Sequence, residues 1–292
     1  MIAMSTAIII LNYNDGERTS KLAQRIAPYK TIDHIILVDN DSADDSLVKM
    51  EAAKEAFPEK TDICRAKTNG GYARGNNFGI RYAIDRYQPD HIFVANPDVF
   101  FTEDVAARMI EVMDGREDCG LVAPVVKQGR NVWDLPGYAG IIESLFLISF
   151  NLRKRRIKNE LMSSGISVCK AGVLEGSFFL LSRRAYEEAG GFDERTFLYA
   201  EETIMARRLL DSGYSEYVIT DMTYDHLHSA SIRKRYASSK ARAFHHFRDS
   251  FRIYNKYYLH TGPVRDMIFD ICWGLGYVER VIYDWVMRLA HR

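Results

Sequence analysis

Two short acidic stretches have residue types and positions suited to chemistry on a phosphorylated ligand. The first is Asn96-Pro97-Asp98, which directly follows the apolar run His91–Ala95. A carboxylate held at the end of a buried strand can bind a hard divalent cation, Mg²⁺ or Mn²⁺, against a diphosphate. An ordinary Asn-Pro-Asp turn is the alternative interpretation. Asp98 is therefore the sharpest candidate for a metal ligand.

The second stretch is the pair Glu201-Glu202, which follows Phe197-Leu198-Tyr199-Ala200 and is predicted to open a helix. A carboxylate buried there beside an acceptor hydroxyl can act as a general base, with its neighbour in support. The alternative is two glutamates that only decorate the positive end of a helix dipole. We expect the catalytic base to be one of these two residues.

A glycine-rich stretch occupies residues 69–79, Asn-Gly-Gly-Tyr-Ala-Arg-Gly-Asn-Asn-Phe-Gly. Glycines before a helix allow a phosphorylated ligand to approach the backbone closely, and Arg74 can then pair with a phosphate. The stretch contains neither the Gly-x-Gly-x-x-Gly of dinucleotide sites nor the Gly-Lys-Ser/Thr of a Walker loop. NAD and ATP are therefore disfavoured.

Two histidines alternate in Asp225-His226-Leu227-His228-Ser229, as on an extended segment. One of them can then face a cleft and contact a metal or a diphosphate. We expect His228 to do so; a structural or surface role is the alternative for a His-x-His pair.

The elements that must position these residues follow a βαβ pattern. Strands are predicted at Ala7–Leu11 and His34–Val38, with a helix near Glu17–Ile26 between them, and the alternation continues to about residue 125. It predicts an α/β fold with a mostly parallel sheet flanked by helices. Ligands bind at the carboxyl ends of such strands, where Asn12 and Asp39 lie.

Length and composition set outer limits on function. At 292 residues the chain suits one main core. Lys+Arg and Asp+Glu balance at 39 each, which removes the electrostatic footprint of a nucleic-acid binder. The four cysteines show no metal-ligand spacing and indicate reduced thiols in a cytoplasmic setting.

Regularity is lost between residues 127 and 170, which we interpret as an insertion on the acceptor side. Residues 236–292 are predicted to form a helical C-terminal region rich in aromatic and basic residues. Such a region suits an interfacial helix at the inner face of the cell membrane, on an anionic leaflet, or a homodimer seam; packing on the core is the third interpretation. Charged residues interrupt Val264–Ala290, so a transmembrane helix is not expected.

Taken in order, these motifs resemble glycosyltransferase family 2, of the GT-A fold, and particularly its rhamnosyltransferase-like members. The resemblance implies a GT-A domain over residues 1–235, with a Rossmann-like, mixed and mostly parallel sheet and a helical C-terminal appendage. The matching stretches are Ile10–Asn14, Val38–Ser42, Asn69–Gly79, Asn96–Asp98 and Gly176–Glu202, the last containing Gly191-Phe192-Asp193-Glu194.

The resemblance also assigns roles to particular residues. Asp39 is similar to the carboxylate that recognises the nucleotide base, and Asn69 and Asn77 are similar to the polar residues that line its pocket. The full set implied to bind the nucleotide-sugar is Asn12, Asn14, Asp39, Asn69, Gly71, Arg74, Asn77, Asn96 and Gly176.

Two positions depart from the family pattern. Asp98 matches the last residue of the metal-binding Asp-x-Asp motif, whose first position is Asn96 here, so Asp98 is the motif's only carboxylate. The base usually lies in a Glu-Asp pair, which is Glu201-Glu202 here, and the match gives the role to Glu202. Ile204 stands where a further acidic residue is often found.

The implied activity is inverting, metal-dependent transfer of a sugar from a nucleotide donor to a cell-surface glycan or a lipid-linked acceptor. Rhamnose from dTDP-rhamnose is the favoured donor sugar, and UDP-hexoses are the alternative. A non-catalytic nucleotide-sugar or glycan-binding protein that retains the fold is the main rival. A nucleotidyltransferase would need a basic, glycine-rich loop after the first strand, which Asn12-Tyr13-Asn14-Asp15-Gly16 does not supply.

Overall fold

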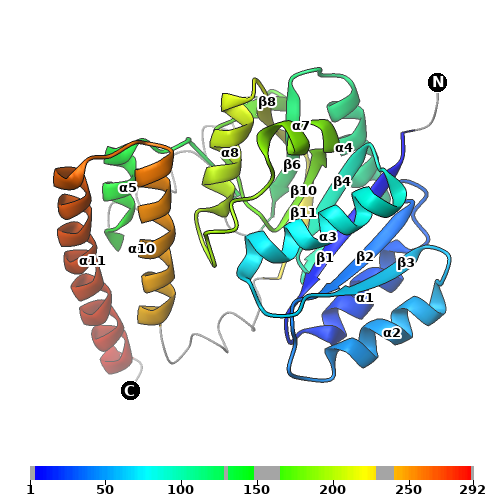
Figure 1. Ribbon diagram of the computed structural model, residues 1–292, viewed down its shortest axis with the longest axis horizontal. Coiled ribbons are helices and arrows are strands. Elements are labelled where there is room, and N and C mark those ends of the chain that lie inside the picture. Colours follow the sequence, from blue (N-terminus) through cyan, green and yellow to red (C-terminus); the bar gives the residue numbers. More distant parts are fainter. Residues whose placement is uncertain (1–3, 128–130, 148–164, 228–239, 291–292) are drawn as a thin grey trace.

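The computed structural model describes residues 4–127, 131–147, 165–227 and 240–290. Within these ranges the chain forms a nine-stranded mixed sheet covered by helices, and a separate group of helices stands beside it (Figure 1). The strand order is β3-β2-β1-β4-β10-β6-β11-β5, with β8 paired to β11. The predicted α/β fold with a mostly parallel sheet on its N-terminal side is confirmed.

The main strands are β1 (Thr6–Asn12), β2 (His34–Asp39), β3 (Thr61–Arg65), β4 (His91–Ala95), β5 (Val99–Phe100), β6 (Cys119–Val126), β8 (Val168–Ala171), β10 (Phe178–Ser182) and β11 (Ser215–His226). A two-stranded ribbon joins β7 (Val132–Trp133) and β9 (Val173–Leu174). The helices are α1 (Gly16–Ile26), α2 (Ser46–Ala56), α3 (Gly71–Tyr87), α4 (Glu103–Asp114), α5 (Tyr138–Ser144), α7 (Arg183–Ala189), α8 (Glu201–Asp211), α10 (Lys240–Tyr257) and α11 (Pro263–Ala290).

Apolar residues of the parallel strands alternate between two hydrophobic layers. Ile8 and Ile10 of β1 pack in a cluster with residues of α1, α2 and α4, whereas Ile9 packs in a cluster with residues of α3, α7 and α8. Successive side chains of a strand point to opposite faces, so an unbroken apolar run is what a sheet covered on both sides requires. This double burial explains why the strands were recognisable from sequence.

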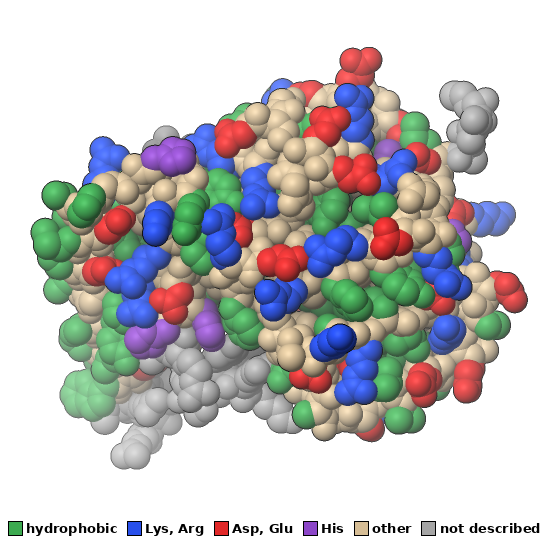
Figure 2. Space-filling view, viewed as in Figure 1, with side chains coloured by type: hydrophobic (Ala, Val, Ile, Leu, Met, Phe, Trp, Pro, Cys, Tyr) green, Lys and Arg blue, Asp and Glu red, His purple; other side chains and the backbone are tan. Residues whose placement is uncertain are grey.

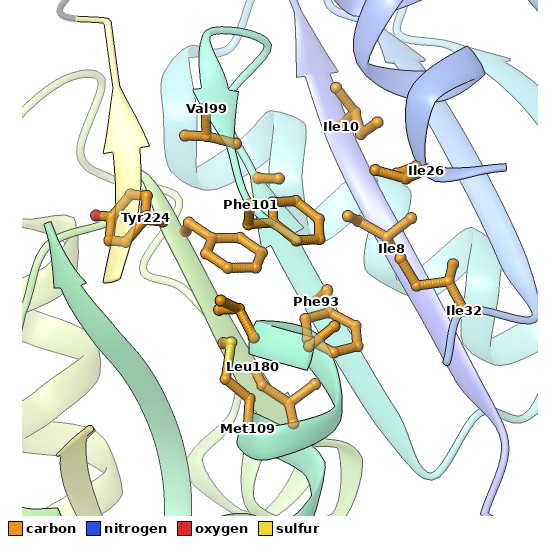
Figure 3. Close-up of a cluster of buried hydrophobic side chains, with 14 of the residues drawn as sticks. Ile8, Ile10, Ile26, Ile32, Phe93, Val99, Phe101, Met109, Leu180 and Tyr224 are labelled. Carbon is orange, nitrogen blue, oxygen red and sulfur yellow. The ribbon is translucent and has the colours of Figure 1, made fainter. Parts of the chain in front are cut away.

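Aromatic rings from β4, β10, β11 and the segment after β5 fill the centre of the first layer (Figure 3). The Phe101 and Phe178 rings stack with centroids 4.1 Å apart, and Phe178 lies 5.5 Å from the Tyr224 ring. The Tyr224 hydroxyl is 2.6 Å from Ser177 Oγ, at the start of β10. The core is thus continuous with the loop that precedes β10.

A third hydrophobic cluster joins α5, α10 and α11, which form the C-terminal lobe. The helix of the predicted insertion therefore packs with the C-terminal helices as one unit. Ile204 of α8 is fully buried in this cluster, so an acidic residue at that position would place a charge inside it. No helix in the described part of the chain is both long enough and apolar enough to cross a bilayer.

Helix α3 begins at Gly71, so most of the glycine-rich stretch, expected to precede a helix, is itself helical. Its glycines bring the helix close to the sheet. A Cβ added to Gly79 would lie 2.5 Å from Val38 Cγ2 and 2.7 Å from Ile9 Cγ2. Close packing of α3 on the sheet, rather than access for a phosphate, is what this glycine provides.

Substitution of Gly79 by alanine should lower the free energy of unfolding by about 1–3 kcal/mol, because the new methyl overlaps two buried β-branched side chains. Gly274→Ala in α11 is the matched control, since a Cβ there meets nothing within 4 Å and alanine favours a helix. Urea denaturation of both variants measures the difference. Equal stability of the two would show that α3 can shift away from the sheet without cost.

Candidate active site

Strand register brings the predicted polar residues to one edge of the sheet. Asn12 at the end of β1 lies opposite Asp39 at the end of β2, and Ile10 lies opposite Ala95 of β4, so residues 96–98 follow at the same edge. Asn12 Nδ2 donates to Asp39 Oδ1 (3.4 Å) and to Ser42 Oγ (2.9 Å). The side chains of the two parallel strands thus meet directly.

Asp39 has the properties needed to recognise a hydrogen-bond donor of a ligand. It is 1% exposed, and its Oδ1 accepts from Asn12 and from the Ser42 backbone N–H (3.2 Å). Its Oδ2 lies 3.4 Å from Arg65 Nε and has no hydrogen-bond partner among the described residues. A buried carboxylate oxygen of this kind can accept an N–H of a nucleotide base. Arg65, which the sequence reasoning missed, sits beside it.

The loops after β1 and β2 are tied together by side chains. Asn14 adopts a left-handed backbone conformation (φ 53°), its N–H donates to Ser42 Oγ (3.0 Å), and its Oδ1 accepts from Ala43 N (2.8 Å). Asn12 Oδ1 accepts from the Asp15 N–H and from Thr19 Oγ1. Both asparagines therefore shape the rim around Asp39.

Asn69 and Gly71 are joined to the same rim by hydrogen bonds from the side chain of Asn40. Asn69 Oδ1 accepts from Asn40 Nδ2 (3.1 Å) and from the Gly71 N–H (3.0 Å). Gly71 has φ 84°, and a Cβ there would lie 2.1 Å from the Phe197 carbonyl oxygen. The structural reason for this glycine is close contact with the loop before α8, which differs from the predicted approach of a phosphate.

Asn77 and Arg74 contact protein rather than open space. Asn77 Nδ2 donates to the Phe192 carbonyl and to Glu194 Oε1, and its Oδ1 accepts from Tyr186 Oη and the Phe192 N–H. These four hydrogen bonds use the full capacity of the amide. The expected role of Asn77 in a nucleotide pocket is therefore corrected to bracing the Gly191–Glu194 loop. Arg74 Nε lies 3.4 Å from Glu194 Oε2.

Asp98 is 6% exposed and pairs with a histidine that the sequence reasoning passed over. Its Oδ1 lies 3.3 Å from His226 Nε2, while His226 Nδ1 lies 3.7 Å from Glu175 Oε1. Burial opposes both charges, but their mutual hydrogen bond and attraction prevail, lowering the pKa of Asp98 and raising that of His226. His228, the histidine preferred from sequence, lies outside the described residues. The alternation of the two histidines did not indicate which one faces Asp98.

The surroundings of Asp98 fit a divalent cation bound together with a diphosphate. Its Oδ2 is buried and has no hydrogen-bond partner within the described ranges. A hard carboxylate oxygen left in this state is a suitable ligand, and Mg²⁺ in particular is often held by one carboxylate plus substrate phosphates. The described part of the chain contains no cluster of three His, Cys, Asp or Glu side chains that would form a complete protein cage. Asn96 contributes its backbone N–H to Ser177 O (2.8 Å).

Glu202 faces the loop before β10. Its Oε1 accepts from the Gly176 N–H at 3.2 Å, and Tyr72 Oη donates to the Gly176 carbonyl. A Cβ on Gly176 would lie 3.0 Å from Glu202 Oε1 and 2.9 Å from Tyr72 Oη, so only glycine leaves this arrangement undisturbed. Burial raises the pKa of Glu202 above the usual glutamate range. A carboxylate tuned in this way suits general-base catalysis near neutral pH.

Glu201 is the more deeply buried member of the pair, at 3% exposure. Its burial and the nearby charge of Glu202 raise its pKa well above the usual range. Tyr199 and Ala200, which precede the pair, both have left-handed backbone conformations, with φ 73° and 64°. Such conformations cost about 1–3 kcal/mol each in residues other than glycine and persist where the surroundings impose them.

The three predicted groups belong to one contact network. Asp98 connects through His226 to Glu175, whose chain neighbour Gly176 binds Glu202. A second chain of contacts leads from Asp39 to Gly176. Asn40, the neighbour of Asp39, bonds to Asn69 and Gly71, and Tyr72, next in the chain, bonds to Gly176.

Behind this network lies another buried carboxyl that the sequence reasoning missed. Glu216 of β11 is 4% exposed, and its Oε2 accepts from the Leu174 N–H at 2.7 Å. Burial, with a further contribution from the charge of Glu202, raises its pKa well above the usual range. Glu216 thus anchors the segment that leads into Glu175 and Gly176.

Solved structures share this architecture. The mannosyltransferase PcManGT from Pyrobaculum calidifontis, in complex with GDP-Man and Mn²⁺, is similar with a TM-score of 0.58 and 14% identity, covering 99% of this chain and 81% of that one. TarS residues 1–349 from S. aureus is similar with a TM-score of 0.50 and 12% identity, covering 94% and 80%. The fold and the site together define a GT-A type protein.

The family follows from the sequence comparison. The profile of glycosyl transferase family 2 matches residues 7–189, so the chain belongs to that family. The matched region contains Asp39 and Asp98 and ends before Glu202.

Two curated proteins are similar to this chain in sequence. The low-salt glycan biosynthesis hexosyltransferase Agl10 of Haloferax volcanii is 25% identical over 199 residues, which are 67% of this chain and 58% of that protein. The rhamnosyltransferase WbbL of Escherichia coli K12 is 24% identical over 188 residues, 62% of this chain and 69% of that protein. The match therefore spans less than two thirds of the Haloferax protein.

Replacement of Glu216 by glutamine should make stability less dependent on pH. A carboxyl whose pKa is raised in the folded state favours folding while it is protonated, and this contribution is lost as pH rises toward that pKa. We expect Glu216→Gln to gain in melting temperature over the parent chain between pH 5 and pH 8. Glu188→Gln is the control, because hydrogen bonding to Arg184 lowers the pKa of that exposed group. A constant difference across the pH range would contradict the assignment.

Proposed function

We propose that the chain is an inverting glycosyltransferase that moves a sugar from a nucleotide donor to a hydroxyl of a glycan or lipid-linked acceptor. One observation carries the proposal: Glu202, with its raised pKa, and Asp98, with its buried free oxygen, are joined through Glu175 and Gly176 into one network. A base and an anchor for a diphosphate are the two groups that a single displacement at an anomeric carbon requires.

In this mechanism Glu202 takes the proton of the acceptor hydroxyl as its oxygen attacks the anomeric carbon. The bond to the nucleotide diphosphate breaks on the opposite face, so the configuration inverts. The Gly176 N–H holds Glu202 Oε1 in place and leaves Oε2 for the incoming hydroxyl. Glu201 supports the base: the charge of Glu202 raises the pKa of Glu201, so the buried pair favours a single negative charge.

The leaving diphosphate would be held beside Asp98. A divalent cation, Mg²⁺ or Mn²⁺, supplies charge neutralisation of the departing phosphates when bound. Asp98 Oδ2 would be its protein ligand, and the hydrogen bond from His226 orients the carboxylate through Oδ1. The Mn²⁺ in the Pyrobaculum mannosyltransferase supports the same requirement here.

The donor is proposed to be dTDP-rhamnose, with UDP-hexoses as the alternative. Support comes from the rhamnosyltransferase-like motif order and from the similarity to the rhamnosyltransferase WbbL. Asp39 would accept the N–H of the pyrimidine base through its Oδ2, which forms an ion pair with Arg65 but has no hydrogen-bond partner among the described residues. A thermal-shift panel of dTDP-rhamnose, UDP-glucose and GDP-mannose with Mn²⁺ tests this. A shift with GDP-mannose alone would contradict the pyrimidine assignment.

Glu202→Gln should reduce transfer by about 10²–10⁴-fold, because the amide keeps the hydrogen bond from Gly176 but cannot accept the proton. Glu188→Gln, a surface change, should retain full activity. Product formation is measured by donor turnover, and donor binding by thermal shift, which should persist in both variants. In the parent chain the rate should fall with decreasing pH at a higher pH than for an ordinary glutamate, since protonation inactivates the base. Full activity of Glu202→Gln would refute the base assignment.

Gly176→Ala should lower kcat by about tenfold or more while leaving donor affinity within a few-fold, because its methyl would displace Glu202 and Tyr72. Gly172, where an added Cβ would meet backbone of the residue 134–135 segment, is unsuitable as a control. Gly137→Ala is suitable, because nothing lies within 4 Å of its Cβ position. A normal kcat in Gly176→Ala would show that Glu202 is not held through this glycine.

A further inference from the structure

The C-terminal lobe presents an unusual helix to its surroundings. Helix α11 is the outermost element of the lobe, on the side away from the sheet, and hydrophobic side chains gather along that margin of the molecule (Figures 1 and 2). Its exposed apolar residues, each 40–66% accessible, are termed the α11 outer face. They are Val264, Met267, Ile268, Ile271, Leu275, Val278, Val281, Ile282, Tyr283, Trp285 and Val286.

Charge is absent from most of this face. From Met267 to Val286, every exposed residue of α11 is apolar or aromatic. A helix that faces water normally carries its charged residues there. Contiguous apolar surface of this extent marks an interaction site.

Three charged residues of α11 bind other residues of the lobe instead. Asp270 pairs with Arg252 of α10, and Glu279 Oε2 accepts from the Leu147 N–H at 2.8 Å. Arg280 donates to the Leu145 carbonyl and lies 3.8 Å from the centre of the Phe244 ring, where burial lowers its pKa. These polar groups are thus used within the lobe, whereas the apolar residues of the outer face remain 40–66% exposed in the described part of the chain.

The shape and composition of the face favour a flat apolar medium over a partner helix. The outer face runs from residue 264 to 286, about 33 Å of helix. In a seven-residue helical repeat the face occupies at least three positions, represented by Val281, Ile271 and Leu275. A single partner helix in a coiled coil contacts only two positions of the repeat, so the face is wider than such a contact. Tyr283 and Trp285 near its C-terminal end are residue types enriched at the boundary between lipid and water.

We propose that the α11 outer face lies on a lipid bilayer, with the helix parallel to the surface and its apolar side chains in the boundary between headgroups and acyl chains. Interfacial helices bury such a face by about 5–10 Å. The contact is hydrophobic, because the exposed residues of the face between Met267 and Val286 are apolar or aromatic. This differs from the attraction to an anionic leaflet that the sequence suggested. This surface belongs to the C-terminal lobe, and its contact with lipid does not depend on the identity of the donor.

The test is vesicle flotation with the full chain. Zwitterionic phosphatidylcholine vesicles should bind the parent protein, and about 0.5 M salt should release little of it, since screening does not weaken a hydrophobic contact. Ile271→Glu combined with Val278→Glu should lower the vesicle partition coefficient by about tenfold or more. Val48→Glu is the matched control, because Val48 is 68% exposed on helix α2, outside the C-terminal lobe. It should bind as the parent does.

Three results would overturn the proposal. Binding only to anionic vesicles at low salt would assign the contact to charge. Conversion of a lipid-free dimer into a monomer by the double substitution, with vesicle binding unchanged, would show that a second copy covers the face. A marked fall in lipid-free melting temperature, beyond that of Val48→Glu, would show that protein covers it. Donor-induced thermal shifts, measured in parallel, separate this question from the proposed function.

Discussion

The register of β1 with its two parallel neighbours is the constraint on which the site depends. Asn12 opposite Asp39, and Ile10 opposite Ala95, place three polar strand ends at one edge. A slip of one residue would turn every side chain of a strand to the other face and exchange the two hydrophobic layers. Because both layers are tightly filled, the core energetically fixes the position of the polar groups. Antiparallel β10 then returns beside β4 and delivers Gly176 to the same edge.

The buried carboxyl groups near this edge differ in the direction in which their pKa values are shifted. Glu201, Glu202 and Glu216 all have raised pKa values, since burial disfavours their charged forms. Charge on Glu202 raises the pKa values of the other two further, so the cluster favours a single ionised member. Asp98 is the opposite case: it stays charged despite burial because His226 pairs with it. Environment, rather than residue type, separates a group that exchanges protons from one that remains an anion.

Much of this arrangement was predictable from sequence because local signals carry it. Unbroken apolar runs ended in Asn12, Asp39 and Asn96, and the rule that ligands meet strand ends grouped them correctly. The failures concern contacts between distant segments. Gly71 accommodates Phe197, and Asn77 braces Phe192, although both patterns resembled a ligand loop. No spacing in the chain indicates which segment will approach a given glycine or asparagine.

The contact between the sheet-containing part of the chain and the C-terminal lobe is a further example of such a long-range effect. Ala200, in its left-handed conformation, is buried in the cluster formed by α5, α10 and α11. Ser250 of α10 donates to the Leu198 carbonyl at 3.0 Å, so the same lobe holds the loop that leads into Glu201-Glu202. Ile204, one turn into α8, packs there as well, which accounts for an apolar residue at this position. The lobe that carries the α11 outer face therefore also packs against the loop in which Tyr199 and Ala200 adopt left-handed conformations directly before the acidic pair.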